Sequence, residues 1–308
     1  MSRKKAHKSE IDRLREFIRQ SGFPLEIELS SVLDSARDHK KLKDMDVSMG
    51  AYYLDKDTKQ GRELDSKVSI PIRYKGELKG KKRNLIGMFL DLLIQCKKIP
   101  GNAWVFFKTP QEIVSVPQCT SVLDCLEWVP RSHSSFAFLP DLHYGNVLKT
   151  TIYDEYILDE NRTNKKVDNL FEAIVTLTKA TAYELDTTIQ GLRDTIDRFK
   201  DISYYPVGYV KLFYPVVVFD GKMYIAEKTK EYGEMDLTPI DHVCLFFDYI
   251  SGSYDIDLHI DIVQREAFDE FFQSVVRDIE ILEKALENKT GIKFREEVKN
   301  ALNLYRGK

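Results

Sequence analysis

The chain has 308 residues with a formal net charge of -3, 43% hydrophobic residues and 31% charged residues. This length allows one large domain or two small ones, and the hydrophobic content is sufficient for a substantial core. The slightly acidic balance argues against a strongly basic nucleic-acid-binding protein, although it allows a local positive groove.

The hydropathy pattern predicts a protein of the cytoplasm without membrane contact. No apolar run approaches the ~20 residues that a membrane-spanning helix needs, and the first residues, MSRKKAHK, lack the apolar core of a signal peptide. The four cysteines show no Cys-x-x-Cys spacing, so they indicate neither a zinc cluster nor a disulfide framework. We therefore expect reduced thiols.

The first part of the chain has the pattern of two helices. Apolar residues recur at helical spacing over 9–20, after Ser9 in a capping position. Pro24 can start a second helix, LEIELSSVLDSA, which carries its own apolar stripe. Glu26 and Glu28 flank this stripe on opposite sides, so either one, or neither, would face a site on the neighbouring strand.

Two later segments alternate in hydropathy, as half-buried strands do. Tyr52 and Leu54, followed by Asp55-Lys56-Asp57-Thr58 and Gly61, predict a hairpin that leads into RELDSKVSI. In RELDSKVSI the polar face displays Asp65. The apolar residues of this segment are expected to share the other side: Leu64, Val68, Ile70 and Ile72. In MFLDLLIQCKK the same period puts Asp91, Gln95 and Lys97 on one face and turns Cys96 toward the core. If the two strands are neighbours, a carboxylate, a carboxamide and an ammonium group converge.

The segment between and after these strands is basic, then aromatic. We interpret KGELKGKKRN (75–84) as a flexible loop whose cations contact phosphate, or serve solubility alone. Pro100-Gly101 predicts a turn into a strand over 104–107. Burial explains the aromatic residues of that strand better than stacking on nucleobases, because four consecutive large side chains cannot face one groove.

The segment 110–200 is variable at first and then helical. A short helix over 121–127 and a strand at SFAFL (135–139) are weak predictions, whereas 167–199 has a clear helical period. His143 in PDLHYGN is interpreted as a hydrogen-bonded loop residue rather than a base.

The segment 204–290 predicts strands and a closing helix. Asp220-Gly221 between two apolar runs indicates a hairpin, two further strands flank 251–253, and 266–286 is amphipathic. Asp257 and Asp261 lie four apart and share a strand face. They are interpreted as a sheet-edge or hairpin pair, with a second metal site as the alternative.

The residues over 62–107 suit phosphodiester hydrolysis. Asp65 and the side-chain carbonyl of Gln95 would supply hard oxygen ligands to a divalent cation, whose shell the phosphate completes. Lys97 would stabilise the charge that develops on the phosphate or orient the attacking water. The alternative is two ordinary strands whose polar residues face solvent.

This order, an acid on one strand and Gln95-Cys96-Lys97 on the next, resembles the PD-(D/E)XK restriction-endonuclease-like nucleases. The Q-x-K triplet resembles their Mrr-like branch. The resemblance implies an α/β fold with an αβββαβ core in 9–108 and beyond, and a mixed central sheet flanked by helices. It implies that Asp65, Gln95 and the backbone carbonyl of Cys96 hold Mg²⁺ or Mn²⁺, and that Lys97 acts on phosphate or water. The Mrr-like spacing favours Glu26 as the helical acid of the site.

The resemblance also implies a DNA endonuclease that acts in prokaryotic defence against foreign DNA. The order PVVVFDG, HVCLFFDY and IDIV, followed by EAFDEFF, resembles uncharacterised prokaryotic proteins with a nuclease-like N-terminal half, which implies one domain over 1–308. A homodimer would present two sites to the two strands of a duplex; a partner subunit of a defence complex is the other partner expected. The alternatives are an RNA-directed nuclease and a catalytically inactive scaffold subunit, since Gln95 replaces an acid.

Overall fold

The computed structural model describes residues 9–78, 81–108, 118–121, 142–158, 168–198, 208–229 and 233–287. Its N-terminal elements are α1 (Glu10–Gln20), α2 (Phe23–Ala36), β1 (Asp46–Asp55), β2 (Gln60–Leu78), β3 (Lys81–Phe107) and β4 (Gln118–Ser121). The central elements are η2 (His143–Asn146), β5 (Lys149–Thr150), β6 (Ile152–Ile157) and α4 (Asn169–Arg198). The C-terminal elements are β7 (Gly208–Lys228), β8 (Met235–Pro239), β9 (His242–Ile250), β10 (Asp255–Gln264), η4 (Arg265–Ala267) and α5 (Phe268–Glu287).

The strands of the described residues form one mixed sheet in the order β1-β2-β3-β7-β10-β9-β5, with β4 and β8 paired to β7 and β6 paired to β3. β1, β2 and β3 form an antiparallel meander, whereas β3 pairs in parallel with β7, and β7 in parallel with β10. Such a parallel pair requires a crossover, and α4 lies within it.

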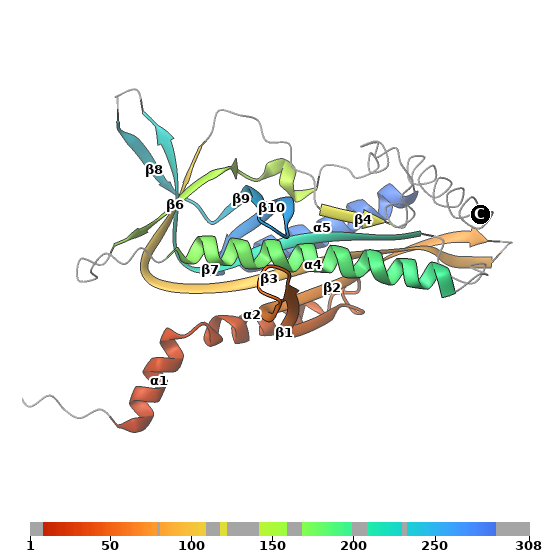
Figure 1. The fold of residues 1–308 in the computed structure, drawn as a ribbon, viewed down its shortest axis with the longest axis horizontal. Helices are drawn as coiled ribbons and strands as arrows, with labels where there is room; N and C mark the ends of the chain where they lie inside the picture. The colour runs from red at the N-terminus through yellow and green to blue at the C-terminus, as the bar shows by residue number, and fades with distance from the viewer. Residues whose placement is uncertain are drawn as a thin grey trace, which may run out of the picture.

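Helices cover both faces of this sheet (Figure 1). On one face, buried leucines of α2 and the apolar stripe of α5 join Val68, Leu90 and Leu212 in one hydrophobic cluster. On the other face, the stripe of α4 packs on Leu93 and Phe213 in a second cluster. The α/β class with a mixed central sheet between helices is therefore confirmed.

Most of the predicted helices and two predicted hairpins are confirmed. Ser9 caps α1, its Oγ accepting the N–H of Asp12 at 3.1 Å, and Pro24 lies in the first turn of α2. β1 and β2 form the hairpin that leads into Asp65, and β9 and β10 pair on either side of 251–253. Residues 122–127 of the predicted short helix and 135–139 of the predicted SFAFL strand lie outside the described part of the chain, while Ser121 belongs to β4.

The interpretation of 75–84 as a flexible loop was wrong. β2 and β3 continue as a ladder through this segment, with Lys75 opposite Asn84 and Leu78 opposite Lys81. Because the hairpin is extended, its basic positions lie ten to thirteen residues beyond Asp65 along β2, a distance of ~30–40 Å at ~3.3 Å per residue. Contact between this hairpin and a phosphate held at Asp65 is therefore not expected.

The predicted turns at Pro100-Gly101 and Asp220-Gly221 were also wrong, because both strands continue past them. β3 and β7 stay parallel on both sides, and four residues of β3 (99–102) face only Gly221 of β7, which makes a large bulge. A Cβ on Gly221 would lie 2.3 Å from the ring of Phe219, and that ring stacks on buried Trp104 with 3.5 Å between centroids. Glycine is needed here for close packing rather than for a hairpin. The burial of Trp104 and Phe106 confirms the core interpretation of that strand.

A kink at Gly50 separates two parts of the β1–β2 hairpin. Gly50 has φ +63°, which favours glycine, and lies opposite Asp65 because Met49 pairs with Ser66 and Ala51 with Leu64. Beyond Asp65 in β2, Val68 packs in the hydrophobic cluster beneath α2 and α5, here called the α2–α5 cluster. Before Asp65, Leu64 packs in the cluster beneath α4, here called the α4 cluster. The prediction that Leu64 shares a face with Val68 was therefore wrong, because simple alternation does not survive the kink.

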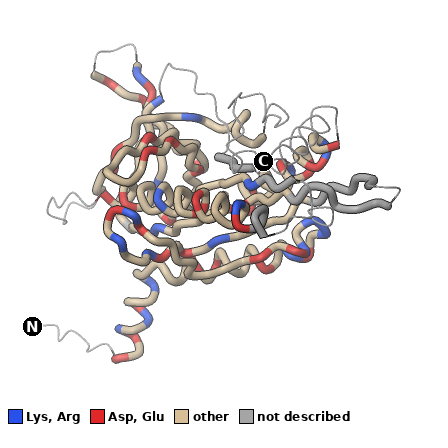
Figure 2. The backbone as a smooth tube through the Cα atoms, turned by 45° about the vertical axis from the view of Figure 1, so that its right-hand side comes forward, with Lys and Arg blue, Asp and Glu red and all other residues tan. Residues whose placement is uncertain are grey.

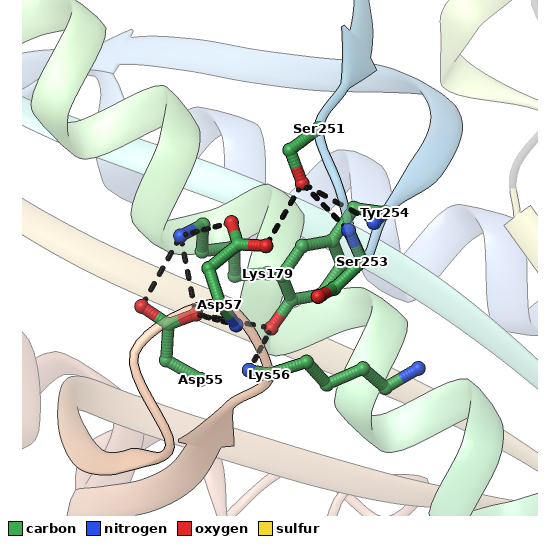
Figure 3. A network of polar contacts seen from close by, with 7 residues as sticks. All are labelled: Asp55, Lys56, Asp57, Lys179, Ser251, Ser253 and Tyr254. Atoms are coloured by element: carbon green, nitrogen blue, oxygen red, sulfur yellow. Dashed lines mark hydrogen bonds and ion pairs between the residues drawn. The ribbon is translucent and has the colours of Figure 1, made fainter.

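The tip of the β1–β2 hairpin is fastened by a polar network (Figure 3). Lys179 of α4 contacts Asp55 at 3.1 Å and Asp57 at 3.0 Å, and Ser251 donates to Asp57 at 3.1 Å. Tyr254 accepts the backbone N–H of Lys56 at 2.7 Å. The β1–β2 turn, α4 and the β9–β10 turn therefore converge on one lysine.

Positive and negative residues alternate along the described backbone rather than forming one large basic face (Figure 2). No helix of the described residues is long and apolar enough to cross a membrane.

Candidate functional site at the divergence of β2 and β3

Asp65 lies where β2 and β3 separate. The ladder between them ends at Ser66 and Ile94, so Asp65 is the next residue of β2 and Gln95 the next residue of β3. The carboxylate fills the position that a backbone carbonyl would hold in a continued ladder. Its Oδ2 accepts a hydrogen bond from the backbone N–H of Cys96 and another from Nε2 of Gln95, each at 2.6 Å.

The orientation of the Gln95 amide follows from this contact. A carboxylate only accepts hydrogen bonds, so the NH₂ end of the amide must face Asp65 and the carbonyl end must point elsewhere. The carbonyl oxygen, Oε1, is buried and has no hydrogen-bond partner in the described structure. A buried acceptor without a donor is costly, and a cation or a water molecule would relieve that cost.

Lys97 follows on the same face of β3. Its positive charge lowers the pKa of Asp65, which places it within electrostatic reach. Its Nζ, however, contacts Oε2 of Glu172, at the start of α4, at 3.1 Å. Sequence reasoning did not identify Glu172 as a partner, because it lies 75 residues further along the chain.

The two candidate glutamates of α2 differ in the structure. Burial, followed by the charges of Asp65 and Glu63, raises the pKa of Glu26, so its carboxyl group lies within electrostatic reach of Asp65. Glu28 instead forms an ion pair with Arg265 at 2.8 Å. The structure thus brings Glu26, and not Glu28, toward Asp65.

Asp65 is short of compensating positive charge. Burial raises the pKa of its carboxyl group, and the charge of Glu63 raises it further, while the Cys96 N–H, Lys97 and Gln95 lower it without cancelling the shift. Cys96 points into the α2–α5 cluster with 6% exposure, and burial raises the pKa of its thiol, so the thiol is not a nucleophile.

The oxygen atoms at this site that could bind a cation include the Asp65 carboxylate and the Gln95 amide oxygen. The N–H and C=O of one strand residue point to the same side, so the carbonyl of Cys96 also faces the gap between the strands. In the described residues no group of three or more His, Cys, Asp or Glu side chains has a geometry that could hold a metal ion. Asp65, Gln95 Oε1 and the Cys96 carbonyl are a set of a different kind, composed of the hard oxygen atoms that Mg²⁺ and Mn²⁺ prefer.

Asp91, the third polar residue of this strand face, belongs to a separate network. Its carboxylate contacts Nζ of Lys211 at 2.7 Å and accepts the hydroxyl of Ser69 at 2.6 Å. Lys67 lies 3.8 Å from Asp91 and 2.6 Å from Glu184 of α4. These charges balance one another under α4 and are not part of the Asp65 site.

A second buried polar cluster was missed from the sequence. His143 lies between Asp278, at 2.5 Å from Nδ1, and Asp261, at 3.1 Å from Nε2. His242 contacts Asp261 at 2.8 Å, and Tyr214 donates to Asp278 at 3.1 Å. The cluster borders a cavity of about 480 Å³ between η2, β9 and α5. The sequence held one signal of this cluster, because Asp278 interrupts the apolar stripe of α5.

Asp257 and Asp261 both lie in the β9–β10 hairpin, as the hairpin interpretation has it, but not at a sheet edge, and the interpretation of His143 as a loop residue also needs correction. β10 is a central strand between β7 and β9, Asp261 is fully buried and Asp257 is exposed. His143 is hydrogen-bonded as expected, but it lies in the short helix η2 and is buried.

No protein-family model, curated protein or solved structure matches this chain.

Proposed function

We propose that the protein is a metal-dependent nuclease that hydrolyses phosphodiester bonds in DNA. The observation that carries this proposal is the pair of Asp65 and Gln95 between two diverging strands, with a buried amide oxygen that lacks a hydrogen-bond donor. A bound divalent cation would supply that oxygen with a partner and would offset the charge of Asp65.

The charges around the pair support a cation more than an anion. Burial and the charges of Asp65 and Glu63 raise the pKa of Glu26, and burial and the charge of Glu63 raise the pKa of Asp65. The ammonium group of Lys97 is engaged by Glu172. Like charges that raise each other's pKa are a common property of sites that bind cations.

In this proposal the side chains have distinct roles. Asp65, Gln95 and the Cys96 carbonyl would hold Mg²⁺ or Mn²⁺, and the ion would supply Lewis-acid chemistry for phosphodiester hydrolysis. Glu26 orients the water molecule or the metal from the α2 side. Lys97 exchanges Glu172 for a phosphate oxygen and stabilises the charge of the transition state.

The order of elements supports the restriction-endonuclease-like part of the proposal. The elements α2, β1, β2, β3, α4 and β7 have the αβββαβ order once β4, η2, β5 and β6, which lie between β3 and α4, are treated as an insertion. Their four strands are adjacent in the sheet, with β3 and β7 parallel. The one-domain reading of 1–308, the cytoplasmic location and the role in defence against foreign DNA belong to the same proposal and rest on the resemblance.

The test is digestion of supercoiled plasmid with Mg²⁺ or Mn²⁺. We expect nicking or linearisation by the intact protein, and a fall in rate of roughly 100-fold or more in Asp65→Asn and Lys97→Met. Lys98→Met is the matched control, because Lys98 is the next residue of β3 but pairs with Asp220 at 3.2 Å. Gln95→Glu adds a carboxylate, so it should retain activity and lower the metal concentration required.

One observation favours an inactive scaffold as the second candidate. Gln95 donates to Asp65 and Lys97 pairs with Glu172, so the site groups satisfy much of one another's bonding. A scaffold would show no thermal shift with Mg²⁺ or Mn²⁺. If the intact protein shows no such shift and leaves plasmid, single-stranded DNA and RNA uncut, the nuclease proposal is refuted. Cleavage of RNA alone would replace DNA as the substrate.

A further inference from the structure

α1 carries an apolar stripe that nothing in the described structure covers. Its large apolar side chains are more than half exposed: Ile11 61%, Leu14 53%, Phe17 68% and Ile18 57%. The helix stands away from the sheet and its covering helices (Figure 1). A stripe of this width on a short, isolated helix is unusual for a monomer, because apolar side chains exposed next to one another mark interaction sites.

The spacing of the stripe fits a two-stranded coiled coil. Ile11, Leu14 and Ile18 have the i, i+3, i+7 spacing of heptad positions a, d and a. Isoleucine at a with leucine at d favours a parallel pair of two helices. In such a pair each of the three residues meets its own copy across the twofold axis.

The charges next to the stripe select the same arrangement. With Ile11 at a, Glu10 takes position g and Arg15 takes position e of the following turn. These two positions face each other across a parallel dimer, so each Glu10 meets Arg15 of the second copy. Arg15 is 77% exposed and forms an i,i+3 ion pair with Asp12 at 3.7 Å. Such an exposed pair contributes little, so Arg15 can exchange it for Glu10 of the second copy. Figure 2 shows both signs of charge along this helix.

The apolar surface continues into α2. Phe23 and Ile27 lie one helical turn apart on its outer side and are 65% and 66% exposed, whereas Leu25 and Leu29 of the same helix are buried. They follow the end of α1 after Ser21 and Gly22 and add exposed apolar surface in the next helix.

From these observations we propose that α1 is a self-association helix, which joins two copies of this chain in a parallel, twofold-symmetric pair. Because the stripe is short, the dimer forms at micromolar concentrations rather than nanomolar ones. This inference does not depend on the nuclease proposal, since no residue of the Asp65 site takes part.

Sedimentation equilibrium across a range of about 1–100 µM measures the dimer constant. We expect Leu14→Glu to weaken dimerisation by at least about tenfold, because it places two carboxylates opposite each other at the centre of the seam. Ile250→Glu is the matched control: Ile250 is 72% exposed at the end of β9, far along the chain from α1, and its change should leave the dimer constant unaltered. Unchanged thermal unfolding shows that both variants fold.

Charge exchange tests the parallel orientation. Glu10→Arg and Arg15→Glu should each weaken the dimer by about two- to fivefold, and the double variant should restore it. An antiparallel pair would not give this rescue. The proposal is overturned if the chain is monomeric at 100 µM, if Leu14→Glu leaves the dimer intact, or if monomeric protein binds anionic phosphatidylglycerol vesicles through α1, which would assign the stripe to a membrane surface.

Discussion

Two aspartates of this protein, the half-buried Asp65 and the fully buried Asp261, have opposite electrostatic environments. Burial raises the pKa of Asp65, whose nearest donors are a backbone N–H and a neutral amide. The pKa of Asp261 is lowered despite complete burial, because His143 and His242 both contact its oxygens. The negative charge of Asp261 is compensated by neighbouring histidines, whereas the negative charge of Asp65 is only partly compensated.

The difference separates a structural role from a functional one. The His143 cluster joins η2, β10 and α5, and each of its charged groups has a partner of opposite sign. The Asp65 site keeps a carboxylate and an amide oxygen without full compensation. Such incomplete compensation is common where a protein binds a ligand that supplies the missing charge.

The largest effect is expected from Asp261→Asn. This change leaves His143 with one carboxylate and removes the negative charge that His242 contacts, and breaking a buried ion pair costs about 3–5 kcal/mol of unfolding free energy. Urea unfolding at pH 7 measures the loss. Asp255→Asn, on the exposed start of β10, is the control and should change the value by less than about 0.5 kcal/mol. A loss below about 1 kcal/mol would show that the cluster is not a structural clamp.

The second prediction concerns pH. Asp261 and Asp278 raise the pKa of His143 to about 9, above the ordinary value of 6.5. A raised histidine pKa contributes stability that is fully present below about pH 6.5 and is lost as pH rises through about 9, up to ~3 kcal/mol. Urea unfolding at pH 6 and at pH 10 should show this decline in the native protein and a smaller decline in His143→Gln. If the two proteins lost equal unfolding free energy between pH 6 and pH 10, His143 would not be the group responsible.

Asp65→Asn should have the opposite consequence for stability. Because the pKa of Asp65 is raised, ionising it costs stability above that pKa, and a neutral side chain avoids the cost. The carbonyl of asparagine can still accept from Gln95 and Cys96. We expect thermal unfolding at pH 7 to show equal or slightly higher stability, by up to about 1 kcal/mol, with cleavage lost. A stability loss above about 1 kcal/mol would give Asp65 a structural role like that of Asp261.

The smallest effect is expected from Glu172→Gln. The pair of Glu172 with Lys97 is exposed on the glutamate side, with 69% of that side chain accessible, so its loss should change stability by less than about 0.5 kcal/mol. Lys97 would no longer need to exchange a partner, and the cleavage rate at low salt should rise about two- to fivefold. Glu227→Gln, which breaks an exposed pair with Lys108 at 3.0 Å, should leave the rate unchanged.

Local patterns predicted the elements better than their connections. The amphipathic helices α1, α4 and α5 and the β1–β2 and β9–β10 hairpins followed from period and turn residues. Gly221 was misread as a turn, because glycine also serves close packing, here beneath the Phe219 ring. The side of Leu64 was misread because the kink at Gly50 interrupts the strand period.

The site was predictable only in part, because local periodicity does not give the pairing between distant segments. A strand period of two places Gln95 and Lys97 on one face in any fold, but their meeting with Asp65 required the register of β2 against β3. Glu172 and the choice of Glu26 over Glu28 depended on how α4 and α2 pack on the sheet.

The sequence by itself determined the amphipathic helices and the shared strand face of Gln95 and Lys97, because both follow from interactions between residues a few positions apart. Only the tertiary structure decided which carboxylate is compensated. Asp261 meets His143 118 residues away and Asp65 meets Gln95 30 residues away, and such partners are chosen by packing rather than by local sequence.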